Sequence, residues 1–284
     1  MNTIACNNFT LEFGKKTLIM GILNVTPDSF SDGGKFFNYD EAVTQGLKMV
    51  EDGAGIIDIG GESTRPFAPA VPLEEEIKRV IPVIEKLAAN INVPISIDTT
   101  KASVAEKAIQ AGASIINDIS ALKFDDKMAE IAVNYGCPVI LMHMQGSPQT
   151  MQIKPKYDDI IEEIKIFFDE VLSNAEKKGI EKSKIIIDPG IGFGKTIKDN
   201  FFLINNLDKF LIFDVPILIG PSRKSFIRNT FKNMSKTEPS LLDIEIGTQA
   251  AISVSILKGA SIVRVHDVKM ALNTIRIIDS LKSY

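Results

Sequence analysis

The chain has 284 residues, of which 45% are hydrophobic and 24% are charged. This composition is typical of a globular protein with a sizeable core, and the length fits two average domains or one large α/β domain of about 250 residues. The 32 Lys and Arg residues against 36 Asp and Glu give a net charge of −4, which argues against a strongly basic binder. We therefore expect neither a nucleic-acid nor a membrane partner, and any anion site must be local.

The cysteines and the chain start bear on the cellular compartment. Cys6 and Cys137 are isolated and have no metal-ligand spacing, which favours free thiols in a reducing compartment. The first residues show no secretory pattern, and no run of about 18 apolar residues occurs in the sequence. These features predict a cytoplasmic protein.

Eight short runs rich in Ile, Val and Leu are predicted to be strands. In chain order they are Thr17–Leu23, Gly55–Gly60, Pro94–Asp98, Ser114–Ile119, Pro138–Met142, Lys184–Asp188, Val215–Gly220 and Ala260–Val265. The runs are almost entirely apolar rather than alternating, which is typical of parallel strands covered on both faces.

Segments with helical periodicity separate these runs. They are Tyr39–Glu51, Leu73–Ala89, Ser103–Ala111, Asp126–Tyr135, Asp158–Lys178, Lys198–Phe210, Asp243–Lys258 and Val268–Leu281. The passages MVEDGAGIIDIG, AIQAGASIINDI and SILKGASIVRVH repeat a helix end, a Gly-Ala turn and a strand. Eight strand–helix units predict an α/β fold, a single-domain (β/α)8 TIM barrel spanning residues 1–284 with its core from about residue 17 onward. An open doubly wound sheet is the alternative.

Polar side chains follow almost every predicted strand. They are Asn24, Asp58, Glu62, Asp98, Asn117, Asp118, His143, Asp188, Ser222, Arg223, Lys224, Arg264, His266 and Asp267. In a barrel these positions converge at the C-terminal end of the strands, where active sites lie. For Asp58, Asp118 and Asp267 an alternative is that each caps the helix that follows.

Positive charge gathers after the last two predicted strands. Ser222–Lys224 and Arg264 supply a hydroxyl, an ammonium and two guanidinium groups, and His266 adds an imidazole. Such a set, next to helix N-termini, indicates an anion site and is typical of phosphate binding in barrels. We expect His266 to belong to this site and His143 to have a structural role.

A second group of polar residues is predicted inside the ring. Asp98, Asn117 and Asp188 offer acceptors in an apolar well that includes Ile97 and Met142. This arrangement suits a flat heterocycle with an amidine-like edge. The two carboxylates could equally bind a divalent metal or act as acid and base, and their spacing does not decide between these roles.

Motifs in this order resemble those of the bacterial dihydropteroate synthases, folate-pathway transferases that are sulfonamide targets. The motifs are GILNVTPDSFSDGG (21–34), GGESTRP (60–66), IDTTK (97–101), IINDIS (115–120), LMHMQG (141–146), IIDPGIGFGK (186–195), SRKS (222–225) and RVHDV (264–268). They cover the chain from about residue 17 to its end. Ala102 stands where the family often has proline.

The resemblance implies a homodimeric TIM barrel for pterin binding. Its reaction would join 6-hydroxymethyl-7,8-dihydropterin diphosphate to 4-aminobenzoate, with Mg²⁺, and release pyrophosphate and 7,8-dihydropteroate. Alternatives are a pterin-dependent methyltransferase, a pterin-binding relative without catalysis, and a Schiff-base aldolase with Lys224 as nucleophile.

The resemblance also assigns residues to the substrates. Pterin-binding residues would be Asp98, Asn117, Met142, Asp188, Phe193 and Lys224. Diphosphate-binding residues would be Asn24, Arg65, Arg264 and His266, with Asn24 also at the magnesium ion. The aminobenzoate side would comprise Phe30, Thr64, Arg65, Pro66, Ser222 and Arg223. The catalytic groups would be Asn24, Lys224, Arg264 and His266.

Overall fold

The apolar runs form strands because Ile- and Val-rich segments fit a pleated backbone that is covered on both faces. The computed structural model describes residues 3–26, 39–63, 68–148, 150–151, 153 and 155–282. The barrel strands in these ranges are β3 (Leu18–Asn24), β4 (Ile56–Gly60), β5 (Ile95–Asp98), β6 (Ile115–Asp118), β7 (Val139–Met142), β8 (Ile185–Asp188), β9 (Leu218–Ile219) and β10 (Ile262–Val265).

The strands form a closed ring. Their order is β8-β7-β6-β5-β4-β3-β10-β9, every pairing is parallel, and a parallel bridge between Ile187 and Ile217 joins the two edges. The predicted (β/α)8 barrel is thereby confirmed, and the open sheet is wrong. Strand β9 is shorter than the predicted Val215–Gly220. Pro216 and Pro221 flank it, and proline has no N–H to donate to a sheet.

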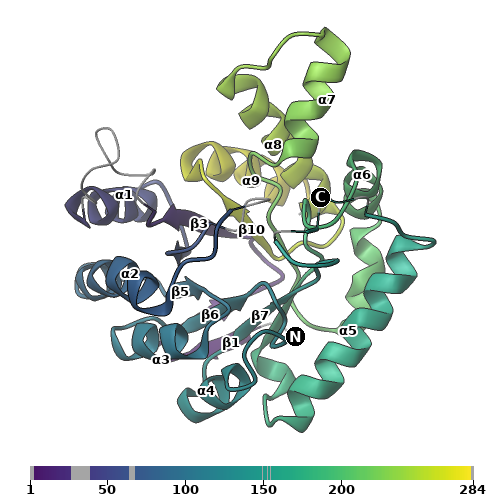
Figure 1. The fold of residues 1–284 in the computed structure, drawn as a ribbon. Helices are drawn as coiled ribbons and strands as arrows, with labels where there is room; N and C mark the ends of the chain where they lie inside the picture. The colour runs from purple at the N-terminus through teal and green to yellow at the C-terminus, as the bar shows by residue number, and fades with distance from the viewer. Residues whose placement is uncertain are drawn as a thin grey trace.

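Helices surround the strands (Figure 1). Their bounds are α1 (Tyr39–Glu51), α2 (Leu73–Ala88), α3 (Ala102–Gln110), α4 (Met128–Tyr135), α5 (Ile160–Lys177), α6 (Ile197–Asn205), α7 (Ser225–Ser235), α8 (Leu241–Leu257) and α9 (Val268–Leu281), with 3₁₀ segments η1 (Lys182–Lys184) and η2 (Leu207–Phe213). Within the described part of the chain, no helix combines the length and apolar character needed to cross a membrane.

Three features of the helical layer differ from the sequence expectation. Helix α7 (Ser225–Ser235) was not predicted, and it extends outward beside α8 in Figure 1. The predicted helix Lys198–Phe210 is instead α6 followed by the 3₁₀ turn η2. Helix α8 begins before the predicted Asp243, because Ser240 and Asp243 form a capping box that starts the helix at Leu241.

Alternate side chains of each strand serve two different cores. In β4, Ile57 and Ile59 pack outward in the main cluster under the helices, whereas Ile56 packs inside the barrel. The interior layer also contains Met20, Ile115, Ile140, Ile186, Leu218 and Ile262. This apolar layer fills the barrel below the ends of the strands that carry the polar residues.

A two-stranded hairpin covers the N-terminal end of the barrel. Strands β1 (Thr3–Cys6) and β2 (Phe9–Glu12) pair antiparallel and were not predicted. Ile4, Leu11 and Phe13 are buried and join the interior cluster. Polar access to the barrel interior is therefore left to its C-terminal end.

Candidate active site

A network of ion pairs and hydrogen bonds links four strands at the C-terminal end of the barrel. Arg264 at the end of β10 donates from Nε to Asp58 Oδ2 at 2.6 Å and from Nη2 to Asp98 Oδ2 at 2.7 Å. Asn117 in β6 donates from Nδ2 to the same Asp58 oxygen at 3.1 Å. The network brings together residues that the resemblance assigned to pterin and to diphosphate.

Asp58 is the member of this network whose role the sequence did not reveal. Its alternative role as a helix cap is wrong, because the fully buried side chain receives the guanidinium of Arg264 and the amide of Asn117. The signal was present in the strand pattern: Asp58 lies between two outward-facing isoleucines, so the period of two directs it into the barrel.

Burial dominates the electrostatics of the two inner carboxyl groups. It raises the pKa of Asp98 to about 7, with Asp58 and Glu76 adding to the rise and Arg264 opposing it. It raises the pKa of Asp188 to about 6, against the hydrogen bond from the Gly190 N–H, 2.8 Å long, and against nearby cations. Both groups can therefore change charge near neutral pH.

Lys224 lies over an aromatic ring beside these carboxyl groups. Its Nζ is 3.9 Å from the centroid of Phe193, and its aliphatic stem passes so close to Gly192 that a Cβ there would lie 3.0 Å from Cδ. Burial and the neighbouring Arg264 lower the pKa of Lys224 to about 8, although Asp188 and Asp98 oppose the shift. The ammonium contacts a ring face, and the charges of two carboxyl groups act on it from nearby.

An apolar wall completes this part of the site. Met142 and Phe193 are buried in one cluster with Ile119 and Met151, and Met144 packs against it. The resemblance assigned Met142 and Phe193 to the pterin, and the structure places them in one cluster, with Lys224 over the Phe193 ring. Ile119 and Met151 were missed because neither carries a polar group that marks a site.

Lys195 and His143 fix the backbone of the loop after β8. The buried Lys195 ammonium donates to the carbonyl of Phe193 and to Nδ1 of His143, both at 3.0 Å. Burial and Lys195 lower the pKa of His143 to about 2, so the ring is neutral and accepts at Nδ1. Burial likewise lowers the pKa of Lys195 to about 7. The pair acts on the loop that carries Phe193, a role the sequence did not indicate for Lys195.

The residues after β9 and β10 meet at a second point. Ser222 Oγ lies 2.9 Å from His266 Nδ1 and accepts from the His266 backbone N–H at 3.2 Å. Arg223 adopts a left-handed φ of 57°, and its Nε donates to Glu245 of α8 at 2.5 Å. Ser222 and His266 thus form one unit, while Arg223 is tied to the outer helix.

Of the two other residues that could cap a helix, Asp267 does so and Asp118 does not. Asp267 accepts from the Met270 N–H at 2.8 Å and caps α9, as one of its two readings predicts. Asp118 instead accepts from the backbone N–H groups of Ser120 and Leu122, so it stabilises the turn after β6.

Asn24 ends β3 beside Gly60 of β4 and is half-buried. It therefore lies at the same end of the barrel as the Arg264 network. Phe30, Thr64, Arg65 and Pro66, which the resemblance placed at the diphosphate and the aminobenzoate, lie outside the described residues.

Comparison with known proteins adds to this geometry. The sequence profile of the family described as "Pterin binding enzyme" matches residues 20–266. The dihydropteroate synthase of Synechocystis sp. is 46% identical over 270 residues, which are 95% of this chain and 92% of that protein.

Solved structures agree over the whole fold. The Yersinia pestis dihydropteroate synthase in complex with a sulfonamide drug superposes with a TM-score of 0.91 at 41% identity, covering 99% of this chain and 100% of that one. The Xanthomonas albilineans enzyme with 4-aminobenzoic acid gives a TM-score of 0.90 at 40% identity, covering 99% and 98%.

The closed barrel, its buried acceptors and the matched profile define a pterin-binding α/β barrel enzyme. Within this class, the relatives named above are dihydropteroate synthases, and none of them is a methyltransferase or an aldolase, the alternatives that the sequence left open. The chain belongs to the dihydropteroate synthase family of transferases.

Proposed function

We propose that this protein condenses 6-hydroxymethyl-7,8-dihydropterin diphosphate with 4-aminobenzoate to give 7,8-dihydropteroate and pyrophosphate. The observation that carries the proposal is the network of Arg264 with Asp58 and Asp98, because it sets an anion-binding fork directly against acceptors for a heterocycle. A substrate with a hydrogen-bond-donating ring and a diphosphate needs both at one place.

The pterin would lie in the well between Asp98, Asn117 and Asp188. The amino group and ring N–H of a pterin are donors, and ionised carboxylates accept from them. Lys224 supplies a donor for a ring acceptor, and the wall of Met142 and Phe193 supports the ring face.

The diphosphate would lie toward Arg264 and His266, with Asn24 and Arg65 contributing to the same subsite. Two N–H groups of the Arg264 guanidinium donate to carboxylates, so the rest of the fork can donate to phosphate oxygens. His266, held by Ser222, adds an imidazole at this side.

The donor set fits a Mg²⁺ ion that is bound mainly through the substrate. In the described part of the chain no three His, Cys, Asp or Glu side chains cluster as metal ligands. Mg²⁺ commonly keeps several waters and binds through one or two protein oxygens plus substrate phosphates, and the half-buried Asn24 amide can supply one such oxygen. When bound, the ion neutralises charge on the departing diphosphate.

The chemistry asks more for charge stabilisation than for a base. Breaking the carbon–oxygen bond next to a dihydropterin leaves a delocalised cation and a pyrophosphate anion, and Arg264 and His266 would bind that anion. The neutral aromatic amine is already nucleophilic, so the protein has to orient it and exclude water. Ser222 and Arg223 are the described residues assigned to that side, together with Phe30, Thr64 and Pro66.

The direct test is formation of 7,8-dihydropteroate and pyrophosphate from the two proposed substrates, with Mg²⁺ present and then chelated. We expect both products in equal amounts and their loss on chelation. Binding of the pterin diphosphate without product would instead indicate a relative without catalysis, and absence of binding would refute the proposal.

The proposed assembly is a homodimer through the outer face of α8 and α9. Leu242, Ile246 and Leu257 of α8 and Ile277 and Leu281 of α9 are exposed, and helices that expose several large apolar residues are candidates for an interaction surface. Sedimentation of the protein should show a dimer, and L242K/I246K should sediment as a monomer. A monomeric parent protein would contradict this assembly.

The cytoplasm is the proposed location of the reaction. Cys6 and Cys137 are both free and buried, as expected of a protein that folds in a reducing compartment. Fractionation of cells that express the full chain would test this location.

A further inference from the structure

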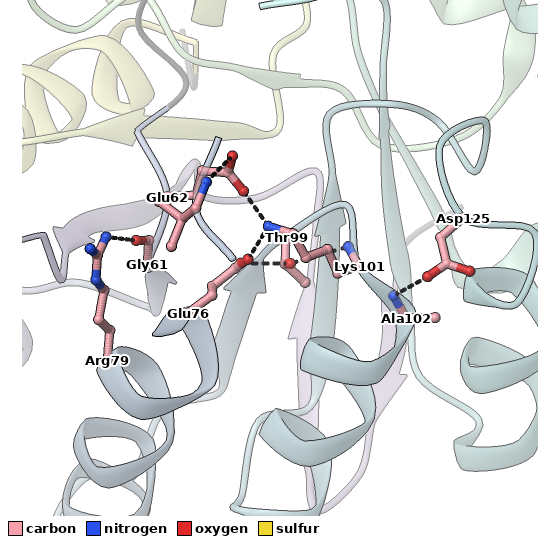
Figure 2. Close-up of polar contacts among 9 residues, drawn as sticks. Gly61, Glu62, Glu76, Arg79, Thr99, Lys101, Ala102 and Asp125 are labelled. Carbon is pink, nitrogen blue, oxygen red and sulfur yellow. Dashed lines mark hydrogen bonds and ion pairs between the residues drawn. The ribbon is translucent and has the colours of Figure 1, made fainter. Parts of the chain in front are cut away.

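A charged cluster lies beside the site and plays no part in the proposed chemistry. Its members are Glu62 after β4, Glu76 in the first turn of α2, and Thr99 and Lys101 after β5, and we call it the Lys101 cluster (Figure 2). The Lys101 ammonium donates to Glu76 Oε2 at 2.5 Å and also to Glu62 Oε2. Thr99 donates from Oγ1 to Glu76 Oε1 at 2.7 Å.

The cluster buries one carboxylate completely and covers most of a second carboxylate and of a lysine side chain. The Glu76 side chain is 0% exposed, whereas Lys101 is 26% and Glu62 is 24% exposed. Burial alone would lower the pKa of Lys101. The hydrogen bonds to Glu62 and Glu76 raise it by more than burial lowers it, so the net pKa is above its usual range. A buried carboxylate without a cation is destabilising, so Glu76 requires the Lys101 ammonium beside it. The second ion pair, with Glu62, fixes the same ammonium from the loop side.

Glu62 connects this cluster to both ends of one loop. Its Oε1 accepts the backbone N–H of Val71 at 3.1 Å, so a residue near the start of the loop between β4 and α2 binds a residue near its end. At the start of the same loop, Arg79 of α2 donates from Nη1 to the Gly61 carbonyl at 2.8 Å. Figure 2 shows Arg79 and Lys101 reaching the loop start from two different units of the barrel.

The contacts reach the next strand end as well. Thr99 follows Asp98 directly, and its Oγ1 accepts the Lys101 backbone N–H at 3.2 Å. The Lys101 cluster therefore ties the end of β5, where the pterin is proposed to bind, to the loop between β4 and α2. Residues 64–66 in that loop are the ones assigned to the aminobenzoate.

We infer that Lys101 is a positioning residue for the aminobenzoate side of the site, acting through Glu62 on the two ends of the loop between β4 and α2. This inference rests on the proposed function. It assigns Lys101 no contact with substrate. Its role is to fix the ends of a loop, and a displacement of about 1 Å at such an end can cost on the order of a hundredfold in rate.

The main variant is K101M, which keeps the aliphatic stem and removes the charge. We expect the KM for 4-aminobenzoate to rise on the order of tenfold, while the KM for the pterin diphosphate changes by less than about twofold. The matched control is K86M, which removes an exposed lysine of α2 that pairs with Asp40 at 2.7 Å. It should change neither KM.

Two further variants separate positioning from general destabilisation. K101R restores a cation and should recover most of the loss in aminobenzoate KM. E62Q keeps an acceptor for the Val71 N–H but weakens the ion pair, so it should raise the aminobenzoate KM less than K101M does, and the two changes should not add in the double variant.

Hydrogen exchange of the Val71 amide gives a readout that does not depend on turnover. In the parent protein this N–H is bound to Glu62, and in K101M its exchange should accelerate while the amides of β4 and β5 keep their protection. If K101M leaves both the Val71 exchange and the aminobenzoate KM unchanged, the inference is wrong. It is also wrong if both KM values rise by the same factor, or if only the apparent kcat falls, in proportion to a loss of folded protein.

The two proposals can fail separately. A parent protein that forms no dihydropteroate refutes the proposed function, and Val71 exchange in K101M then decides alone whether Lys101 fixes the loop. A parent protein that is active, with Val71 exchange unchanged in K101M, refutes only the role of Lys101.

Discussion

The two ends of the barrel strands bury different kinds of side chain. At the C-terminal end Asp58, Asp98 and Arg264 bury charge in a network of hydrogen bonds. At the N-terminal end Ile262 and Leu218, the first residues of β10 and β9, belong to an apolar layer that the β1–β2 hairpin covers. Because one end buries charges that the proposed reaction uses and the other buries mainly apolar surface, a substitution should reduce activity most at the first and should reduce stability alone at the second.

The largest effect is expected from R264M, which removes the cation of the network. It deprives the departing diphosphate of a donor, so kcat/KM of the folded protein should fall on the order of a thousandfold. It also leaves two buried carboxylates without their cation, which should lower stability as well. Steady-state kinetics with the pterin diphosphate would measure the fall in kcat/KM. The control R228M removes an exposed pair with Glu238 and should change little. A fall of less than about tenfold in R264M would contradict the proposed role of Arg264 in binding the diphosphate.

The counterpart at the other end is I262A. Ile262 is fully buried inside the barrel, so truncation leaves a cavity and should lower the free energy of unfolding by about 2–5 kcal/mol. Denaturant unfolding would measure this change. Because the layer does not contact the proposed substrates, kcat/KM of the folded fraction should stay within about twofold. A large loss of kcat/KM at unchanged stability would show that the two ends are not separate.

The pH dependence of kcat/KM tests which groups at the charged end must be ionised for activity. Binding of ring N–H donors requires ionised carboxylates, so activity should fall as the pH drops through the range of about 7 for Asp98 and about 6 for Asp188. Activity should also fall above about pH 8, because Lys224 then loses its proton. K224R stays protonated and should lose the alkaline limb only. An alkaline limb that persists in K224R would remove Lys224 from this role.

The smallest effect is expected from D125A. Asp125 accepts the N–H of Ala102 at the start of α3 at 2.9 Å, a bond that proline at position 102 could not make (Figure 2). Its loss should lower the free energy of unfolding by about 1 kcal/mol and leave both KM values unchanged. Thermal unfolding would measure the change. In A102P, which lacks the same N–H, the further change D125A should cost less.

The sequence predicted the barrel because its signals are local. Apolar strands and the repeated Gly-Ala turns each occupy a few consecutive residues, and Gly53, Gly112 and Gly259 do adopt the positive φ that such turns require. The hairpin was missed because its strands alternate buried and exposed residues and lack the continuous apolar run that marks the barrel strands. Helix α7 was missed although Phe226, Ile227 and Phe231 stand at helical spacing, because one helix was expected after each strand and α8 filled that place.

The site was predictable only where the position in a strand determines it. Residues at strand ends, such as Asn117, Asp188 and Arg264, lie at one end of the barrel as expected. The partners of those residues were not predictable. Glu76 binds Lys101 across 25 positions and Arg264 binds Asp58 across 206, and such pairings depend on how the helices and strands pack.

The central claim is that the charged end of the barrel binds the pterin diphosphate, and a crystal structure of that complex tests it most directly. We predict the ring against Asp98, Asn117 and Asp188, with the diphosphate at Arg264 and His266. A pterin bound elsewhere, or a diphosphate with no contact to Arg264, would contradict the account.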